Sequence, residues 1–176
     1  EPFSDALAIY AVKMIGENLG KAVANGRDIE ARSNMAIAST IAGCAFSNAS
    51  VGLVHGIALP LGAIYHVPHG IANAIMLPYV MEFNAMAAPE KFRDIAIALG
   101  ADVTGMSLRD AALEASGIVR QMCIDCGVPL LKEVGVKKED IPSIVKDTIT
   151  YARLPNNPRT VSEKDIEKIL IAALEK

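Results

Sequence analysis

Apolar residues recur along this chain at the three- and four-residue intervals of amphipathic helices. The first such segment contains Leu7, Ile9, Val12, Met14, Ile15 and Leu19. Capping residues, glycines and prolines divide the chain into helices predicted at residues 5–24, 29–48, 68–84, 89–99, 108–126, 141–152 and 162–174. No strand-length alternation and no βαβ pattern stands out, so the sequence predicts an all-α fold.

The first two helices carry specific predictions about their ends and their burial. Ser4 is expected to cap a helix that begins at Asp5, and Asp28 is expected to cap the next one. Residues 33–48 contain no charged side chain and are rich in alanine and other small residues. The helix from Ile29 to Asn48 is therefore predicted to be among the most buried in the domain.

Residues 51–65 form the most apolar segment of the chain. Pro60 has no N–H to offer the carbonyl of Gly56, so any helix here is expected to be short or kinked, and a turn is expected at residues 66–68. The longest apolar stretch, from Val51 to Ile64, falls short of the roughly 20 residues that a helix needs to cross a bilayer. The segment is thus predicted to lie in a core and not in a membrane.

Composition narrows the classes of protein to which the chain can belong. With 176 residues, 52% of them hydrophobic, it has ample apolar material for one folded domain. The formal net charge of −3 provides no attraction to nucleic acid or anionic lipid, so neither is expected as a partner. The three cysteines are too few, and odd in number, for a disulfide framework. Since the chain starts with neither a methionine nor a basic, apolar leader, we expect an excised or processed cytoplasmic protein.

The three histidines, His55, His66 and His69, lie within fifteen positions of one another. Lone histidines on apolar faces are more often core or rim groups than ligands, and clustering alone leaves both interpretations open. On an unbroken helix His55 and His69 would lie ~21 Å apart along the axis, too far to share an ion. The prolines between them allow a fold-back that brings the two imidazoles together. Two ligands do not complete a site, however, and no carboxylate lies in residues 51–79.

A longer ordered pattern surrounds these histidines. It comprises Phe46-Ser47-Asn48, Gly52-Leu53-Val54-His55-Gly56-Ile57-Ala58-Leu59-Pro60-Leu61-Gly62-Ala63, Pro68-His69-Gly70-Ile71-Ala72-Asn73-Ala74, Leu77-Pro78 and Phe83-Asn84. The pattern closely resembles the signature of the iron-containing (group III) alcohol dehydrogenases. The similarity continues through residues 91–96, 127–129 and 157–159, so it covers essentially the whole chain.

The resemblance implies a two-domain enzyme of the dehydroquinate-synthase-like fold. Residues 1–176 would be its helical, metal-binding C-terminal domain, and the N-terminal α/β domain that binds NAD or NADP would be absent from this chain. The family holds a divalent metal, iron or zinc, through an Asp and a His one helical turn apart and through two further histidines. The last two match His55 and His69, whereas the first pair would lie just before Glu1.

Further positions carry weaker candidate roles. Many members carry a histidine near the nicotinamide where this chain has Leu59, so Leu59 is a candidate contact of the cofactor. Phe46, with Ser47 and Asn48, is more simply the end of a core helix near the cleft, and it is a second candidate contact of the cofactor or substrate. His66 is a candidate acid or base, beside the simpler interpretation of an exposed loop histidine.

Cys123 and Cys126 have CxxC spacing at a predicted helix end but lie outside any βαβ unit, which favours packing over redox or zinc chemistry.

The resemblance also implies an activity. The intact enzyme would interconvert primary alcohols or diols with aldehydes by hydride transfer to or from the nicotinamide, whereas this chain alone would be catalytically silent. Its expected partners are the small alcohol or aldehyde, its own N-terminal domain and further copies in a homo-oligomer. Two alternatives stay open: a glycerol dehydrogenase-like or related metal-dependent enzyme, and a helical interaction module without catalysis.

Overall fold

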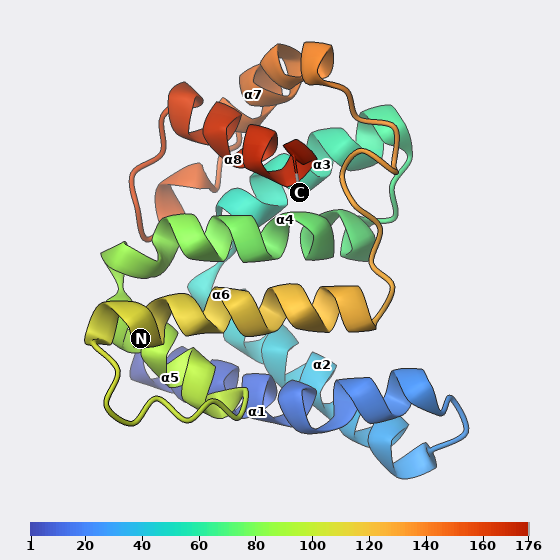
Figure 1. The fold of residues 1–176 in the computed structure, drawn as a ribbon, viewed down its shortest axis with the longest axis vertical. Coiled ribbons are helices and arrows are strands. Elements are labelled where there is room, and N and C mark those ends of the chain that lie inside the picture. Colours follow the sequence, from blue (N-terminus) through green and yellow to red (C-terminus); the bar gives the residue numbers. More distant parts are fainter. Residues whose placement is uncertain (176) are drawn as a thin grey trace. The chain divides into compact units, whose positions relative to one another are not determined.

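The computed structural model describes residues 1–175, and all regular elements of this part of the chain are helical (Figure 1). The α-helices are α1 (Pro2–Ala24), α2 (Ile29–Ala49), α3 (Leu53–Tyr65), α4 (His69–Asn84), α5 (Pro89–Ala98), α6 (Leu108–Asp125), α7 (Ile141–Ile149) and α8 (Glu163–Glu175). Short 3-10 helices are η1 (Ala85–Ala87), η2 (Lys138–Asp140) and η3 (Leu154–Asn156). The predicted all-α fold is confirmed.

Of the two helix caps predicted near the N-terminus, one is confirmed and one is wrong. Asp28 caps α2, because its Oδ1 accepts the backbone N–H of Ala31 at 2.9 Å. The prediction for Ser4 is wrong, since α1 already begins at Pro2 and Ser4 lies buried within its first turn. There the Ser4 hydroxyl donates to the carbonyl of Glu1 at 3.1 Å. Pro2 suits the first position of α1, because the first residue of a helix has no use for an N–H.

The chain divides into two compact units. The first consists of Glu1–Ser50 and Ala88–Ile118, and the second of Val51–Ala87 with the described residues that follow Ile118. The long helix α6 runs from the first unit into the second. Both predicted metal ligands belong to the second unit.

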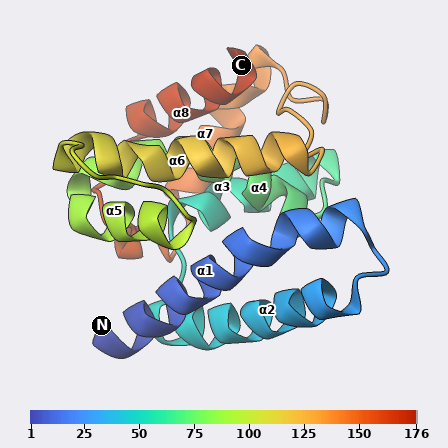
Figure 2. The ribbon, with the colours of Figure 1, turned by 60° about the horizontal axis from the view of Figure 1, so that its bottom comes forward.

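In the first unit, α1 and α2 lie side by side and are joined by a short loop (Figure 2). Their buried positions recur every seven residues: Ser4, Ala11 and Asn18 in α1, and Ala31, Ala38 and Ala45 in α2. This is the repeat of a coiled coil, here with small side chains that let the two backbones approach closely. Asn34 donates its Nδ2–H to Oδ1 of Asn18 at 3.0 Å, which satisfies the larger polar group on this line.

The predicted burial of the helix from Ile29 to Asn48 is wrong. Within α2 the alanines named above are buried, whereas Ile29, Ile37 and Phe46 are 72%, 49% and 54% exposed. Because α1 contacts α2 along a single line of small side chains, much of the circumference of α2 stays uncovered. A lack of charge therefore did not indicate burial.

No single described helix, α2 included, is long and apolar enough to cross a membrane. Only α2 and α3 taken together have the length and the apolar composition that crossing would need.

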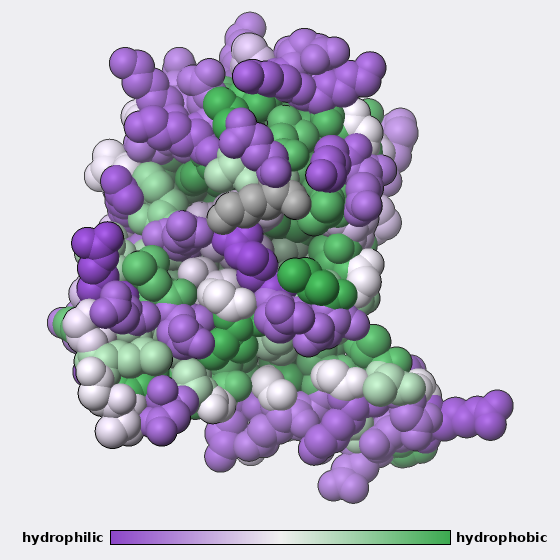
Figure 3. Space-filling view, in the orientation of Figure 1, coloured by the Kyte–Doolittle hydropathy of each residue, from purple (hydrophilic) through white to green (hydrophobic). Residues whose placement is uncertain are grey.

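The second unit contains the main apolar core, built largely from α3, α4, α7 and α8. Its largest fully buried side chains include Leu53, Ile57, Leu61, Met76, Leu131, Ile144, Ile166 and Leu170. Hydrophilic side chains gather over α7 and α8 on the face shown in Figure 3. Residues 51–65 thus contribute to a core, as their composition predicted.

A proline inside α3 does not end that helix. Pro60 leaves the carbonyl of Gly56 without the N–H that would normally meet it. Thr148 of α7, which is fully buried, donates its hydroxyl to this carbonyl at 3.4 Å. The close packing of α3 here suits a glycine, because a Cβ at position 56 would lie 3.1 Å from Cδ1 of Tyr151 and 3.5 Å from Cγ2 of Thr148. A side chain from another helix therefore supplies the donor that Pro60 lacks.

The same device recurs in α4, which continues past Pro78 to Asn84. Pro78 leaves the carbonyl of Ala74 without a helical donor, and the thiol of Cys123 in α6 lies 3.5 Å from it and donates to it. Burial, and secondarily the neighbouring Cys126, raises the pKa of the Cys123 thiol. The protonated thiol is thus the favoured form, which supports packing over redox chemistry for the CxxC pair.

Replacing Thr148 by valine should lower the free energy of unfolding by about 1–3 kcal/mol. Valine keeps the shape of threonine but leaves the buried Gly56 carbonyl without a donor. Thr148→Ser is the matched control, because it keeps the hydroxyl. Urea unfolding followed by circular dichroism would measure both variants, as the chain has no tryptophan. A valine variant at least as stable as the serine variant would contradict the role of the hydroxyl.

Tyr65, the last residue of α3, makes stability sensitive to alkaline pH. Burial and, next, a hydrogen bond to Asp140 raise its pKa from 10.0 to about 12. Between these values the folded chain keeps a proton that the unfolded chain loses, so the free energy of unfolding should fall as pH rises from 10 to about 12. Urea unfolding at several alkaline pH values should show a shallower fall for Tyr65→Phe than for the exposed-site control Tyr10→Phe. Equal slopes in the two variants would be the contrary result.

Candidate metal centre

His55 and His69 come together where the chain folds back between α3 and α4. His55 lies in the first turn of α3, and His69 is the first residue of α4. Between the helices His66 adopts a left-handed backbone conformation, with φ of 56°, and Pro68 caps α4. The centroids of the two imidazole rings are 5.3 Å apart, and the ring planes are inclined by 56°. The turn thus joins side chains that a continuous helix would hold far apart.

This separation fits two ligands of a single ion. Imidazole nitrogen binds zinc at about 2.1 Å, which places the ring centroid roughly 3.2 Å from the ion and separates two tetrahedrally arranged centroids by about 5 Å. The observed 5.3 Å agrees with that value. Imidazole is also a suitable ligand for iron, so the pair suits either metal.

The surroundings of His55 favour the form that binds metal. Burial is the main cause that lowers the pKa of His55, and the neighbouring His69 lowers it further. A neutral imidazole has a lone pair to give to an ion, whereas an imidazolium has none. The electrostatics of the pair therefore agree with a ligand role.

The donor set of the described residues is nevertheless incomplete. In residues 1–175 no group of three or more His, Cys, Asp or Glu side chains is arranged to hold a metal ion. A catalytic zinc site has about three protein ligands and one open position. A catalytic ion bound by His55 and His69 would therefore take its other protein ligands from outside the described residues. The ligand role of the two histidines stays a prediction.

A partly buried amide pair fixes the start of α3, two residues before His55. Asn84 and Asn157 exchange two hydrogen bonds, with donor–acceptor distances of 2.9 and 2.8 Å. The Oδ1 of Asn157 also accepts the backbone N–H of Leu53 at 3.4 Å. A Cβ on Gly52 would lie 3.3 Å from the Cα of Asn157, so the close approach suits a glycine. The sequence pattern included these residues but did not reveal that they contact one another.

Asn73 is a further residue of the site that the sequence did not single out. It lies four residues after His69, and its Nδ2 is 2.9 Å from the His69 carbonyl oxygen and 3.0 Å from His69 Nε2. Residues at this spacing are neighbours on a helix surface, so the interval of four is the signal that could have identified it.

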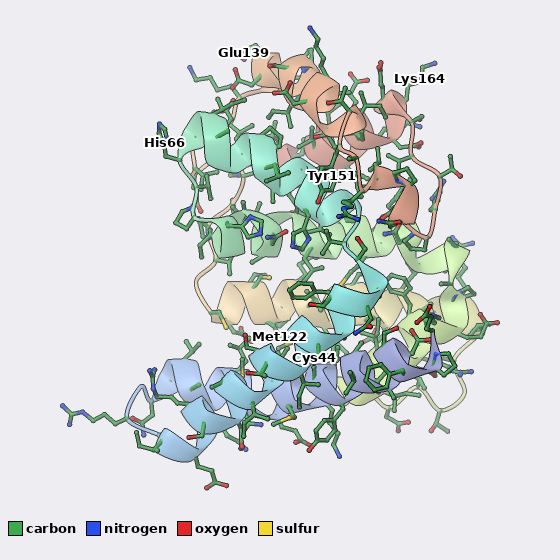
Figure 4. The ribbon with its side chains drawn as sticks, turned by 180° about the vertical axis from the view of Figure 1, so that it is seen from behind. Cys44, His66, Met122, Glu139, Tyr151 and Lys164 are labelled. Atoms are coloured by element: carbon green, nitrogen blue, oxygen red, sulfur yellow. The ribbon has the colours of Figure 1, made fainter. Side chains whose placement is uncertain are left out.

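The other predicted site residues are exposed. His66 lies at the end of α3 and points outward (Figure 4). Leu59 on α3 is 49% exposed. Phe46, on α2 in the first unit, is likewise exposed. The proposed contacts of Leu59 and Phe46 with the cofactor, and the acid or base role of His66, stay predictions.

The whole chain matches a known protein family. Residues 1–174 match the model of the Fe-containing alcohol dehydrogenase family, C-terminal. The chain belongs to this family. The resemblance predicted from the pattern around the two histidines is thereby confirmed.

Curated relatives of the chain include several alcohol and aldehyde oxidoreductases. The chain is 43% identical to a 1,3-propanediol dehydrogenase of Klebsiella pneumoniae over 169 residues, which are 96% of this chain and 44% of that protein. It is 44% identical to a lactaldehyde reductase of Escherichia coli K12, covering 94% of this chain and 43% of the relative. The chain thus spans less than half the length of these relatives.

Solved structures show the same fold. A crystal structure of a 1,3-propanediol oxidoreductase matches 98% of this chain and 46% of its own, with a TM-score of 0.96 and 42% identity. An alcohol dehydrogenase from Oenococcus oeni matches 98% of this chain and 45% of its own, with a TM-score of 0.95 and 38% identity. The helical architecture is therefore that of the C-terminal part of the family.

Proposed function

We propose that this chain is the metal-binding part of an NAD- or NADP-dependent alcohol dehydrogenase that interconverts small primary alcohols or diols with aldehydes. The observation that carries the proposal is the His55–His69 pair, whose 5.3 Å separation suits one ion. The relatives named above support the alcohol or aldehyde substrate class. The remaining length of those relatives would correspond to a nucleotide-binding domain and to the missing metal ligands.

In the proposed reaction the residues of this chain bind and orient. His55 and His69 would each give one nitrogen lone pair to a divalent iron or zinc ion. When bound, such an ion polarises the substrate oxygen and lowers the pKa of the alcohol, while a nicotinamide accepts or donates the hydride. Thr148 and Asn157 hold α3 at the Gly56 carbonyl and at the Leu53 N–H, and so keep His55 in place beside His69.

The predicted cofactor contacts would act through their apolar side chains. Leu59 and Phe46 are exposed in this chain and would exclude water where they meet the nicotinamide. Leu59 cannot carry a proton, although many family members have a histidine at this position. The proton of the alcohol would therefore leave by another group, for which His66 is the candidate within this chain.

A chimera tests the proposed function. Its C-terminal part is this chain, and its N-terminal part is the segment of the Klebsiella pneumoniae 1,3-propanediol dehydrogenase that precedes the matching region. We expect the chimera to oxidise short alcohols or diols with NAD or NADP in the presence of iron(II) or zinc, as measured by absorbance of the reduced nicotinamide. This chain alone should show no turnover.

Three outcomes distinguish the alternatives. Turnover of short primary alcohols or diols supports the proposal, whereas a marked preference for glycerol favours the glycerol dehydrogenase-like alternative. A folded chimera that binds metal and cofactor without any turnover would favour the interaction module. Assembly as a homo-oligomer and a cytoplasmic location stay predictions.

A further inference from the structure

The contacts of Asn73 with His69 determine how its amide is oriented. Nδ2 lies 2.9 Å from the backbone carbonyl oxygen of His69, and this oxygen can only accept a hydrogen bond. The amide nitrogen therefore faces His69, and the reverse orientation would set Oδ1 against that carbonyl oxygen. Oδ1 of Asn73 is buried and has no hydrogen-bond partner among the described residues, so it does not determine the orientation.

The orientation of the amide in turn determines the proton on the imidazole. The second N–H of the Asn73 amide points to Nε2 of His69, 3.0 Å away. Since Nδ2 can only donate, Nε2 must accept and cannot carry a proton. In the neutral ring the proton then lies on Nδ1.

We propose that Asn73 is a positioning residue that holds His69 as the neutral Nδ1–H tautomer and makes Nε2 the nitrogen that binds the ion. This inference rests on the proposed metal role of His69 and goes beyond it by naming the side chain that selects the tautomer of this histidine. Nε2 could hold an ion only once the Asn73 N–H has moved off it, since both would use the same lone pair.

Nuclear magnetic resonance of isotopically labelled ring nitrogens tests the tautomer without any turnover. The spectra are recorded on the metal-free chain at a pH at which the imidazoles are neutral. We expect His69 to show its proton on Nδ1 and its lone pair on Nε2. A proton on Nε2 of His69 in the unaltered chain would overturn the proposal.

Two variants separate the role of Asn73 from general stability. Asn73→Leu removes both donors and should weaken the preference for the Nδ1–H form. Asn73→Asp replaces the donor by an acceptor and should move the proton to Nε2. The control is Asn48→Leu, which removes a similar amide bond to the carbonyl four residues earlier, at 2.8 Å, on a helix without a histidine. An unchanged His69 tautomer in both Asn73 variants, with circular dichroism like that of the control, refutes the proposal.

Adding zinc to the labelled chain separates this inference from the proposed function. We expect zinc to shift the signals of His55 and His69 and to leave His66 unaffected, with Nδ1 of His69 still protonated. Zinc bound through Nδ1 of His69 would overturn the role of Asn73 but support the metal pair. A chain with the expected tautomer whose His55 and His69 signals ignore zinc would support the role of Asn73 in selecting the tautomer and contradict the two-histidine metal pair.

Discussion

Alanine in place of His55 or His69 should lower the metal affinity of the chimera by at least about 100-fold and remove most of its turnover. Loss of a residue that only supports a metal ligand already costs about 10–100-fold in affinity or activity, and loss of the ligand itself should cost more. The two rings are 5.3 Å apart, so removal of either leaves the other without its partner on the ion. Metal content after desalting and the absorbance of reduced nicotinamide would measure the two effects.

His66→Ala is the matched control for both variants. It removes an imidazole from the same part of the chain, but from a residue at the end of α3 that is not predicted to bind the ion. We expect the control to keep the metal, and circular dichroism should show that all three variants are folded. Retention of a full complement of metal by a folded His55 or His69 variant would show that other groups hold the ion.

Local patterns predicted the helices because the signals lie within a few residues of the feature they specify. Asp28 caps α2 through Ala31, and the glycines and prolines separate the helices as expected. The approach of His55 and His69 also followed from local reasoning, since a fold-back was expected between them, although it occurs at residues 66–68 and Pro60 lies inside an unbroken α3. Which residues complete a metal site did not follow, because the described residues do not contain a full donor set.

Contacts between distant residues could not be predicted from one sequence. The missing donor of Pro60 was evident, but its replacement, Thr148, lies 92 residues from Gly56. Asn84 and Asn157 are separated by 73 positions. The uncharged character of α2 suggested burial, yet the seven-residue repeat of small side chains was the better guide to its packing. That repeat describes one narrow contact line and not a fully covered helix.

Asn157→Ala should lower the free energy of unfolding of the second unit by roughly 3 kcal/mol, because about 1–3 kcal/mol is lost for each buried polar group left without a partner. The substitution removes both bonds to Asn84, which is only 6% exposed, and also removes the acceptor of the Leu53 N–H. Urea unfolding followed by circular dichroism would measure the loss. Because Leu53 begins the helix that carries His55, we also expect weaker metal binding in the chimera.

A double-mutant cycle with Asn84 distinguishes this amide pair from a loss of packing alone. Asn84→Ala by itself leaves the Asn157 amide short of two hydrogen bonds, whereas the double variant removes both members of the pair. The double variant should therefore lose about 1–2 kcal/mol less than the sum of the two single variants, since contacting residues in one hydrogen-bond network are coupled. Asn48→Ala controls for the loss of an exposed asparagine, with its one bond to the Cys44 carbonyl, and should change stability by less than about 1 kcal/mol. Additive effects at positions 84 and 157 would mean that each asparagine acts through separate contacts and that the pair does not anchor α3.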